Sequence, residues 1–250
     1  MKRRLVAALA CRNQGSRLYG KPLQNLDVSQ GFCILDNILQ SLKMTSCVDE
    51  IVLGISEGVE NEIFKSYAVK YGLKFIVGHE IDVLSRLIQC GKAGEATDIL
   101  RVTTESPFRY FELDEAIWAD HLNADSDATF LENIIDGCGV EFLKLSALEK
   151  SHQRGEERHR SELCTLYIRE HPDEFKIQRI RPPAELIRQD LRLTVDNPED
   201  LVVCRKIYMH FKELSPRIPV RQIVEYLDAN PDLIQLIAPF TEQGYSTMYL

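Results

Sequence analysis

The chain has 250 residues, 44% hydrophobic and 27% charged, which is the composition of a folded globular protein rather than a disordered one. A net charge of −8, from 30 Lys and Arg against 38 Asp and Glu, argues against a general nucleic-acid-binding protein, because such proteins need a basic face for phosphates. Seven scattered cysteines without a CxxC pair argue against a zinc site or disulfide framework, and no apolar run approaches the ~18 residues that span a bilayer, so we expect a cytoplasmic protein with reduced thiols and no membrane partner.

The first half of the chain alternates between strand and helix patterns. We interpret the short apolar run at residues 5–10 as a buried strand rather than a signal peptide, because Arg12 follows closely and no clear cleavage site is present. Further patterns predict strands at 50–55, 74–77 and 98–103, and helices at 31–44, 60–71, 82–92 and 113–122. This alternation predicts βαβ units and a mixed, mainly parallel sheet flanked by helices, which is the α/β class.

The second half is less regular. Strands are predicted at 140–145 and 191–195, an extended segment at 175–181, and helices at 146–152, 162–170, 198–211, 218–227 and 233–237. The charge run at 153–160 is interpreted as a solvated helix end or loop. We expect a single domain over 1–250, with an excursion at 128–182 and C-terminal helices within 214–250 to which the sequence assigns no role.

The loop after the first strand is the first candidate site, because ligands of α/β sheets lie at the carboxyl ends of strands. It carries Gly15 and Gly20 with Arg12, Arg17 and Lys21. Glycines allow backbone N–H groups to face an anion, and the three cations can hold a polyphosphate. The loop lacks the Walker ending and the GxGxxG pattern. On charge and glycine alone, a polar surface loop with solvated cations is an equally good interpretation.

The same stretch resembles Ala-Arg-x-x-Ser-x-Arg-Leu-Pro-Gly-Lys, the signature of the cytidylyltransferases that make CMP-activated sugars. These include the spore-coat polysaccharide, 3-deoxy-manno-octulosonate and acylneuraminate cytidylyltransferases. Arg12, Arg17 and Lys21 match in register, whereas Gly15 and Tyr19 stand where the family has Ser and Pro. The resemblance implies a Rossmann-like nucleotide-diphospho-sugar transferase fold.

Further stretches resemble motifs of the same family, and the resemblance runs from about residue 5 to about 213. They are the segments at 82–86, 101–107, 136–141, 160–168 and 191–201. Two of them depart from the family pattern: Thr104-Glu105 replaces Gly-Asp, and Leu163 replaces His. The simpler interpretations remain open for Asp82 and Asp196, which both suit the N-cap of a helix.

The resemblance implies three groups of site residues. Nucleotide binding falls to Ala10, Cys11, Arg12, Asn13, Gly15, Ser16, Arg17, Lys21, Arg86 and Thr103, with Arg12, Arg17 and Lys21 in the catalytic role of neutralising the triphosphate. Acceptor binding falls to Glu141, Arg160 and Glu162, and Mg²⁺ binding to Glu105 and Asp196. Glu141 could instead be the exposed member of an alternating strand.

The activity that the resemblance implies is Mg²⁺-dependent transfer of CMP from CTP to an acidic sugar, with release of pyrophosphate, for surface polysaccharide or glycoconjugate synthesis. It also implies a homodimer. One alternative is a catalytically silent relative that binds a nucleotide or sugar and acts through a partner. A glycosyltransferase of related fold would need an Asp-x-Asp metal motif, and Asp125-Ser126-Asp127 is better interpreted as a turn.

Overall fold

The structure is a computed structural model that describes residues 2–15 and 17–248. Its strands are β1 (Leu5–Cys11), β2 (Asn25–Asp27), β3 (Phe32–Cys33), β4 (Glu50–Ser56), β5 (Lys74–Gly78), β6 (Asp98–Val102), β7 (Ala128–Leu131), β8 (Glu141–Lys144) and β9 (Ile177–Ile180). Within the described residues, seven strands form one sheet in the order β5-β4-β1-β6-β8-β7-β9, and β2 pairs with β3 in a separate two-stranded sheet. Only β8 runs antiparallel to its neighbours in the large sheet. The predicted mixed, mainly parallel α/β sheet is confirmed.

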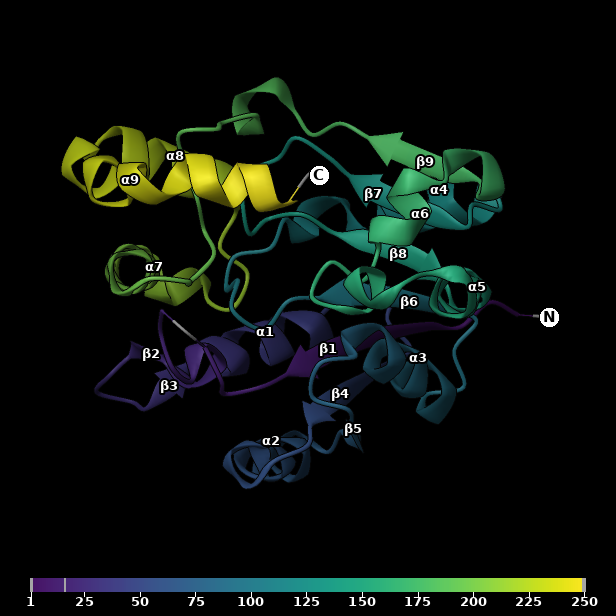
Figure 1. The fold of residues 1–250 in the computed structure, drawn as a ribbon. Coiled ribbons are helices and arrows are strands. Elements are labelled where there is room, and N and C mark those ends of the chain that lie inside the picture. The colour runs from purple at the N-terminus through teal and green to yellow at the C-terminus, as the bar shows by residue number, and fades with distance from the viewer. Residues whose placement is uncertain (1, 16, 249–250) are drawn as a thin grey trace.

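Helices cover both faces of this sheet (Figure 1). They are α1 (Ile34–Lys43), α2 (Ile63–Tyr71), α3 (Val83–Ala93), α4 (Asp114–Asn123), α5 (Leu145–Arg154), α6 (Leu166–Glu170), α7 (Pro198–His210), α8 (Val220–Asp228) and α9 (Pro231–Met248). Among the described residues, no helix is both long and apolar enough to cross a membrane.

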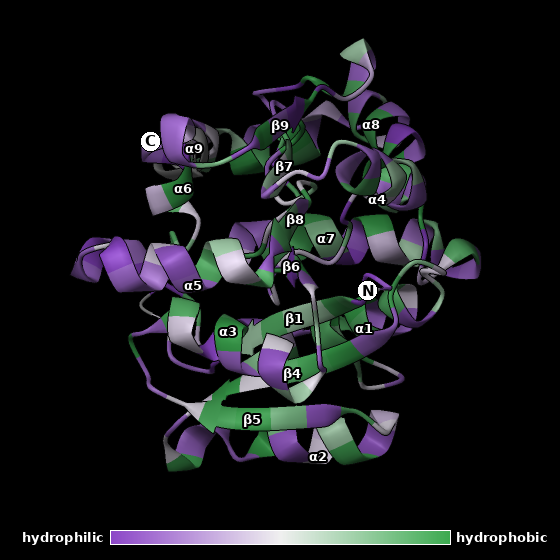
Figure 2. Ribbon diagram, turned by 90° about the vertical axis from the view of Figure 1, so that its right-hand side faces the viewer, coloured by the Kyte–Doolittle hydropathy of each residue, from purple (hydrophilic) through white to green (hydrophobic). Residues whose placement is uncertain are grey.

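Strand β1 lies in the interior of the sheet, between β4 and β6, and both of its faces are apolar. Leu5 and Leu9 pack into the core on the side of α1 and α7, whereas Val6 and Ala8 pack on the side of α3. Figure 2 shows β1 and β4 as largely hydrophobic strands between helices. Such continuous apolar runs are expected where a parallel strand is buried on both faces.

The carboxyl ends of β1, β4 and β6 meet at one edge of the sheet. Cys11 pairs in register with Ile55 of β4, and Leu9 pairs with Val102 of β6. Because the three strands are parallel, the loops that follow them leave the sheet on the same side. This edge therefore brings together the loop after residue 11, the loop after β4 and the segment 103–107. The segment before α3 follows β5, which is parallel to β4, and it reaches the same edge.

Two predictions of secondary structure are wrong. Residues 191–195 do not form a strand of the sheet. Apart from an isolated bridge between Asp136 and Arg192, the N–H groups of this segment donate hydrogen bonds to carbonyls in loops. Its apolar residues are buried beside α7, so burial without strand pairing produced the pattern. The predicted helix over 162–170 is limited to α6, and the sequence analysis did not identify β7.

The stretch 128–182 contributes β7, β8 and β9 to the large sheet. Further along the chain, α7 is followed by α8 and α9, and Figure 1 shows α9 beside α8 at the end of the molecule away from β5. Ile237 of α9 is fully buried in the core that includes α7 and α8. The C-terminal helices thus belong to the main body of the fold.

Candidate active site

Two adjoining cavities open at the carboxyl ends of β1 and β6. The smaller cavity has a volume of about 220 Å³ and lies against the loop after β1. The larger cavity has a volume of about 600 Å³ and extends toward β8 and α6. The residues that line both cavities are Arg12, Arg17, Val83, Arg101, Thr103, Glu105, Glu162 and Asp196. The boundary between the two cavities is therefore strongly charged.

We call residues 12–21 the phosphate loop, after the role proposed below. The loop closes on itself, because Gly20 N–H donates to the carbonyl of Asn13 at 2.8 Å and Gly20 adopts a φ of 61°. A side chain at Gly15 would collide with the carbonyl oxygen of Leu18. The loop as folded therefore accepts only glycine at the position where the family has Ser.

The three cations of the phosphate loop all line the smaller cavity, and each faces a carboxylate. Lys21 Nζ lies 2.6 Å from Asp196 Oδ1, and Arg17 lies 3.4 Å from the same oxygen. Arg12 forms an ion pair with Glu162. The predicted convergence of these cations on one pocket is therefore present in the structure, and Ser16 lies outside the described residues.

Glu105 and Asp196 come from distant parts of the sequence and meet at the boundary of the cavities. The N–H of Val195 donates to the carbonyl of Glu105 at 3.0 Å, which joins the two backbones. Burial opposes ionisation of Asp196, but the hydrogen bond and charge of Lys21, with the charge of Arg17, hold its pKa below the usual value. Asp196 is therefore ionised at neutral pH.

The donor set at this boundary fits Mg²⁺ in kind. Mg²⁺ prefers oxygen ligands and is commonly held by one or two carboxylates together with substrate phosphates. Glu105 and Asp196 supply two carboxylates beside the phosphate loop. In the described part of the chain, no three His, Cys, Asp or Glu side chains gather as a ready-made metal site. Phosphate oxygens and water would have to complete the coordination.

Some predicted nucleotide-binding residues support the smaller cavity from behind. The Cys11 thiol is buried and contacts the carbonyl of Leu9, and Cys11 does not line the cavity. Arg86 lines it but is buried, and its guanidinium donates to the carbonyls of Cys11 and Gly54, each at 3.2 Å. The buried Asn13 side chain donates to the carbonyl of Glu60 at 2.5 Å. Ala10 and Thr103 line the cavity as expected.

Glu141 lies in the wall of the larger cavity, where its negative charge is balanced by two arginine side chains. One of its oxygens accepts from Arg169 at 2.8 Å and from Thr165 at 3.2 Å, and the other accepts from Arg101 at 3.0 Å. Burial opposes its ionisation, but the two arginines lower its pKa overall. Glu141 therefore holds two guanidinium groups against the larger cavity.

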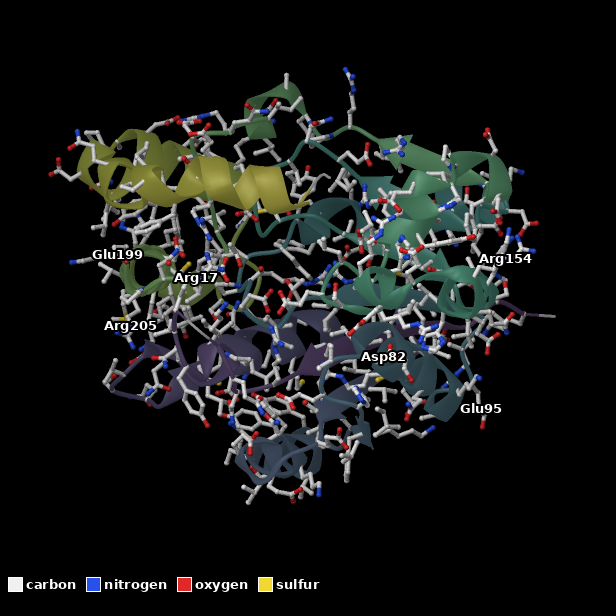
Figure 3. The ribbon with its side chains drawn as sticks, viewed as in Figure 1. Arg17, Asp82, Glu95, Arg154, Glu199 and Arg205 are labelled. Atoms are coloured by element: carbon white, nitrogen blue, oxygen red, sulfur yellow. The ribbon has the colours of Figure 1, made fainter. Side chains whose placement is uncertain are left out.

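Arg160 lines neither cavity, unlike the other two residues predicted to bind the acceptor. Its guanidinium donates to the carbonyls of His152 and Gly155 at 3.1 and 3.4 Å. The neighbouring charge run forms exposed ion pairs, such as that of Arg154 with Glu174. Figure 3 shows Arg154 well away from Arg17 of the phosphate loop.

Four charged residues had no role predicted from the sequence: Arg101, Asp136, Arg169 and Arg192. The first three line the larger cavity. Burial raises the pKa of Asp136 to about 6. Arg101, Asp136 and Arg192 each stand within a segment that resembles a family motif, so a sequence signal existed for these three. Arg169 lies one residue beyond such a segment, and no comparable signal marked it.

Comparisons with known proteins identify the family and the fold of this chain. The sequence profile of the family described as cytidylyltransferase matches residues 7–228. The spore coat polysaccharide biosynthesis protein SpsF of Bacillus subtilis is 28% identical over 238 residues, which cover 91% of this chain and 95% of that protein.

Two solved structures share the fold. A cytidylyltransferase from Leptospira borgpetersenii superposes with a TM-score of 0.81 at 22% identity, over 94% of this chain and 97% of that chain. A CMP:2-keto-3-deoxy-manno-octonic acid synthetase complexed with CTP superposes with a TM-score of 0.61 at 14% identity, over 83% of this chain and 99% of that chain. With most of its length matched by the family profile, the chain belongs to the cytidylyltransferase family, a family of nucleotidyltransferases.

Proposed function

We propose that this protein transfers CMP from CTP to an acidic sugar and releases pyrophosphate, as a step toward a surface polysaccharide or glycoconjugate. The observation that carries the proposal is the shared boundary of the two cavities, where the phosphate-loop cations face Glu105 and Asp196. Two substrates placed in adjoining cavities would meet at this boundary. The polysaccharide role of SpsF and the CTP bound to a structural neighbour support the choice of substrates.

In this proposal the smaller cavity takes the nucleotide, and the larger cavity takes the sugar. The triphosphate lies against Arg12, Arg17 and Lys21. The sugar carboxylate lies near Arg101 and Arg169, the two arginines that Glu141 holds in the wall of the larger cavity. Arginine suits this role because its planar group can donate two hydrogen bonds to one carboxylate.

The reaction forms a bond between a sugar oxygen and the α-phosphorus of CTP and breaks the bond from that phosphorus to the leaving pyrophosphate. Lys21 and the loop arginines neutralise the negative charge that moves onto pyrophosphate. The adjoining cavities hold the two reactants in one orientation. Mg²⁺ bound by Glu105 and Asp196 would stabilise charge on the α-phosphate and lower the pKa of the attacking hydroxyl.

We also propose that the protein acts in the cytoplasm as a homodimer. The cysteines are free thiols, as is typical of proteins in a reducing compartment. Sedimentation analysis of the full chain tests the dimer: a monomer at working concentrations would refute it.

The test of the activity is pyrophosphate release from CTP with Mg²⁺ and a panel of acidic sugars, compared between wild type, Asp196→Asn and Asp190→Asn. Asp190 is a matched control, because it pairs with Arg188 and lines neither cavity. We expect release that requires Mg²⁺ and falls by about a hundredfold or more in Asp196→Asn, because a misplaced or missing catalytic charge costs this much. Asp190→Asn should retain wild-type release.

Calorimetric titration with CTP separates the alternatives. CTP binding without release from any sugar in the panel would favour the catalytically silent relative. The support for that alternative is the set of departures from the family pattern at Gly15, Tyr19, Thr104, Glu105 and Leu163. An absence of CTP binding would refute the nucleotide site itself.

A further inference from the structure

Arg192 is buried directly behind the boundary of the two cavities. It is one of the largest fully buried side chains in the described structure, and it lies four residues before Asp196 in the segment that leads into α7. It lines neither cavity, whereas Asp196 lines both. Arg192 can therefore influence the site only through the residues that it contacts.

The guanidinium group of Arg192 faces three partners at once. One terminal nitrogen lies 2.8 Å from Asp196 Oδ2, and Nε lies 3.0 Å from Asp200 Oδ1. The other terminal nitrogen donates to the carbonyl oxygen of Phe240 in α9 at 2.5 Å. A planar guanidinium group holds its N–H donors at fixed angles and can contact three acceptors at once, whereas the ammonium group of a lysine lies on a flexible stem and has no such fixed geometry.

Asp200 completes the support of Asp196 from the main chain. Its second carboxylate oxygen accepts the N–H groups of Asp196 at 3.0 Å and of Asn197 at 2.8 Å, at the start of α7. Asp196 is thus held by Asp200 through its backbone and by Arg192 through its side chain. Both supports come from within the fold rather than from the cavities.

This arrangement gives the two carboxylate oxygens of Asp196 different partners. Oδ2 faces the buried Arg192, whereas Oδ1 faces Lys21 and Arg17 of the phosphate loop. Rotation of the carboxylate would break the contact with Arg192 in the interior. The orientation that presents Oδ1 to the phosphate loop is therefore fixed from behind.

We propose that Arg192 is a positioning residue for nucleotidyl transfer, which sets the rotation of the Asp196 carboxylate so that Oδ1 is presented to the substrates. Through the carbonyl of Phe240, it also makes α9 part of the support of the site. This inference rests on the proposed function. It assigns a role to the C-terminal helix, for which the sequence analysis had none.

The test compares Arg192→Lys and Arg192→Gln with Arg109→Lys in the full-length protein. Arg109 is a matched control, because it is also buried and pairs with Asp114 at 2.6 Å and Thr45 at 2.9 Å, yet it lines neither cavity. We expect Arg192→Lys to lower kcat by about 10- to 100-fold, because small misplacements of a reacting group cost this much, while KM for CTP changes less than about threefold. Arg192→Gln should change kcat and KM in the same way as Arg192→Lys, because the positioning of Asp196 requires the guanidinium geometry and not a positive charge alone.

Arg109→Lys measures what loss of a buried arginine does to the fold in general. We expect it to lower the unfolding midpoint by an amount similar to Arg192→Lys but to leave kcat within about twofold of wild type, since Arg109 lines neither cavity. Equal losses of kcat in the two variants would assign Arg192 a purely structural role and overturn the inference. Wild-type kcat in Arg192→Lys would overturn it as well.

Two further measurements do not depend on turnover. Hydrogen exchange should be faster in α9 around Phe240 in Arg192→Lys but not in Arg109→Lys, because only the former removes the donor to that carbonyl. Mn²⁺ with CTP, observed by electron paramagnetic resonance, should give an altered spectrum in Arg192→Lys. Unchanged exchange and an unchanged spectrum would refute the positioning role. A wild-type protein without nucleotidyl transfer would instead refute the proposed function.

Discussion

The ion pair between Arg12 and Glu162 predicts that Glu162→Gln binds CTP more tightly than wild type. Glu162 precedes α6, lines both cavities and leaves its side chain 67% exposed. Under the proposed function, its carboxylate pairs with Arg12, one of the loop cations that would bind the triphosphate. The nucleotide must therefore displace Glu162 from Arg12 before it gains that contact.

The size of the effect follows from the exposure of the pair. Exposed ion pairs contribute about 0.2–1 kcal/mol, which corresponds to a factor of about 1.4–5 in the dissociation constant. Glutamine keeps the length of the side chain, and the main-chain carbonyl of residue 162 still accepts from Arg101, at 3.1 Å in the wild-type structure. The substitution therefore removes the competing charge with little change to the loop.

Calorimetric titration with CTP in the absence of acceptor measures this change. Glu156→Gln is the control, because Glu156 is 79% exposed, pairs with Arg158 and lines neither cavity. The gain in affinity should shrink as salt is added, since exposed pairs are screened. Unchanged or weaker CTP binding in Glu162→Gln would show that Glu162 does not compete with the nucleotide and would refute the reasoning.

Two more substitutions test the carboxylates of the site. Glu105→Asp withdraws the carboxylate by one methylene from the boundary of the cavities, and we expect kcat to fall on the order of 10²-fold in the pyrophosphate assay, because displacement of a reacting group by an ångström costs that much. Equal or higher activity would refute the requirement for the longer side chain of Glu105 at this position. Burial raises the pKa of Asp136 from 3.8 to about 6, so its contribution to stability is present below pH 3.8 and is lost as the pH rises through 6. Asp136→Asn should therefore be more stable than wild type toward neutral pH, by an amount that grows between pH 4 and pH 7 to about 3 kcal/mol in denaturant titrations. A difference that does not change with pH would contradict the assigned cause.

The centre of the sheet could be predicted from sequence because its strands are buried on both faces. The apolar runs of β1 and β4 are long enough to be distinguished from their polar surroundings. In contrast, β7 has only four residues and begins directly after a polar turn. The segment 191–195 has the apolar pattern of a strand, but its N–H groups bond to loop carbonyls, and no local pattern distinguishes these two kinds of burial.

The candidate site was predictable in its residue types and less so in its contacts. A loop of glycines and cations after a buried strand indicated the phosphate loop, and the family resemblance pointed to Glu105 and Asp196. The same resemblance could not show that Arg160 points to the carbonyls of His152 and Gly155, because side-chain direction depends on the local backbone. The contact of Arg192 with the carbonyl of Phe240 was equally hidden, since the two residues lie 48 positions apart in the sequence.

The charges of the site also bear on which form of the nucleotide it binds. Lys21 and Arg17 pair with Asp196, and Arg12 pairs with Glu162, so two carboxylates already offset most of the charge of the three loop cations. A free triphosphate that took Lys21 would leave the carboxylate of Asp196 partly buried with fewer cations, which is costly. Under the proposed function, Mg²⁺ held by Asp196 would supply the positive charge that Lys21 gives up to the phosphates, so a triphosphate bound together with Mg²⁺ would avoid this cost. We therefore expect the ion pairs of Asp196 and Glu162 with the loop cations to favour binding of the metal–nucleotide complex over the free nucleotide.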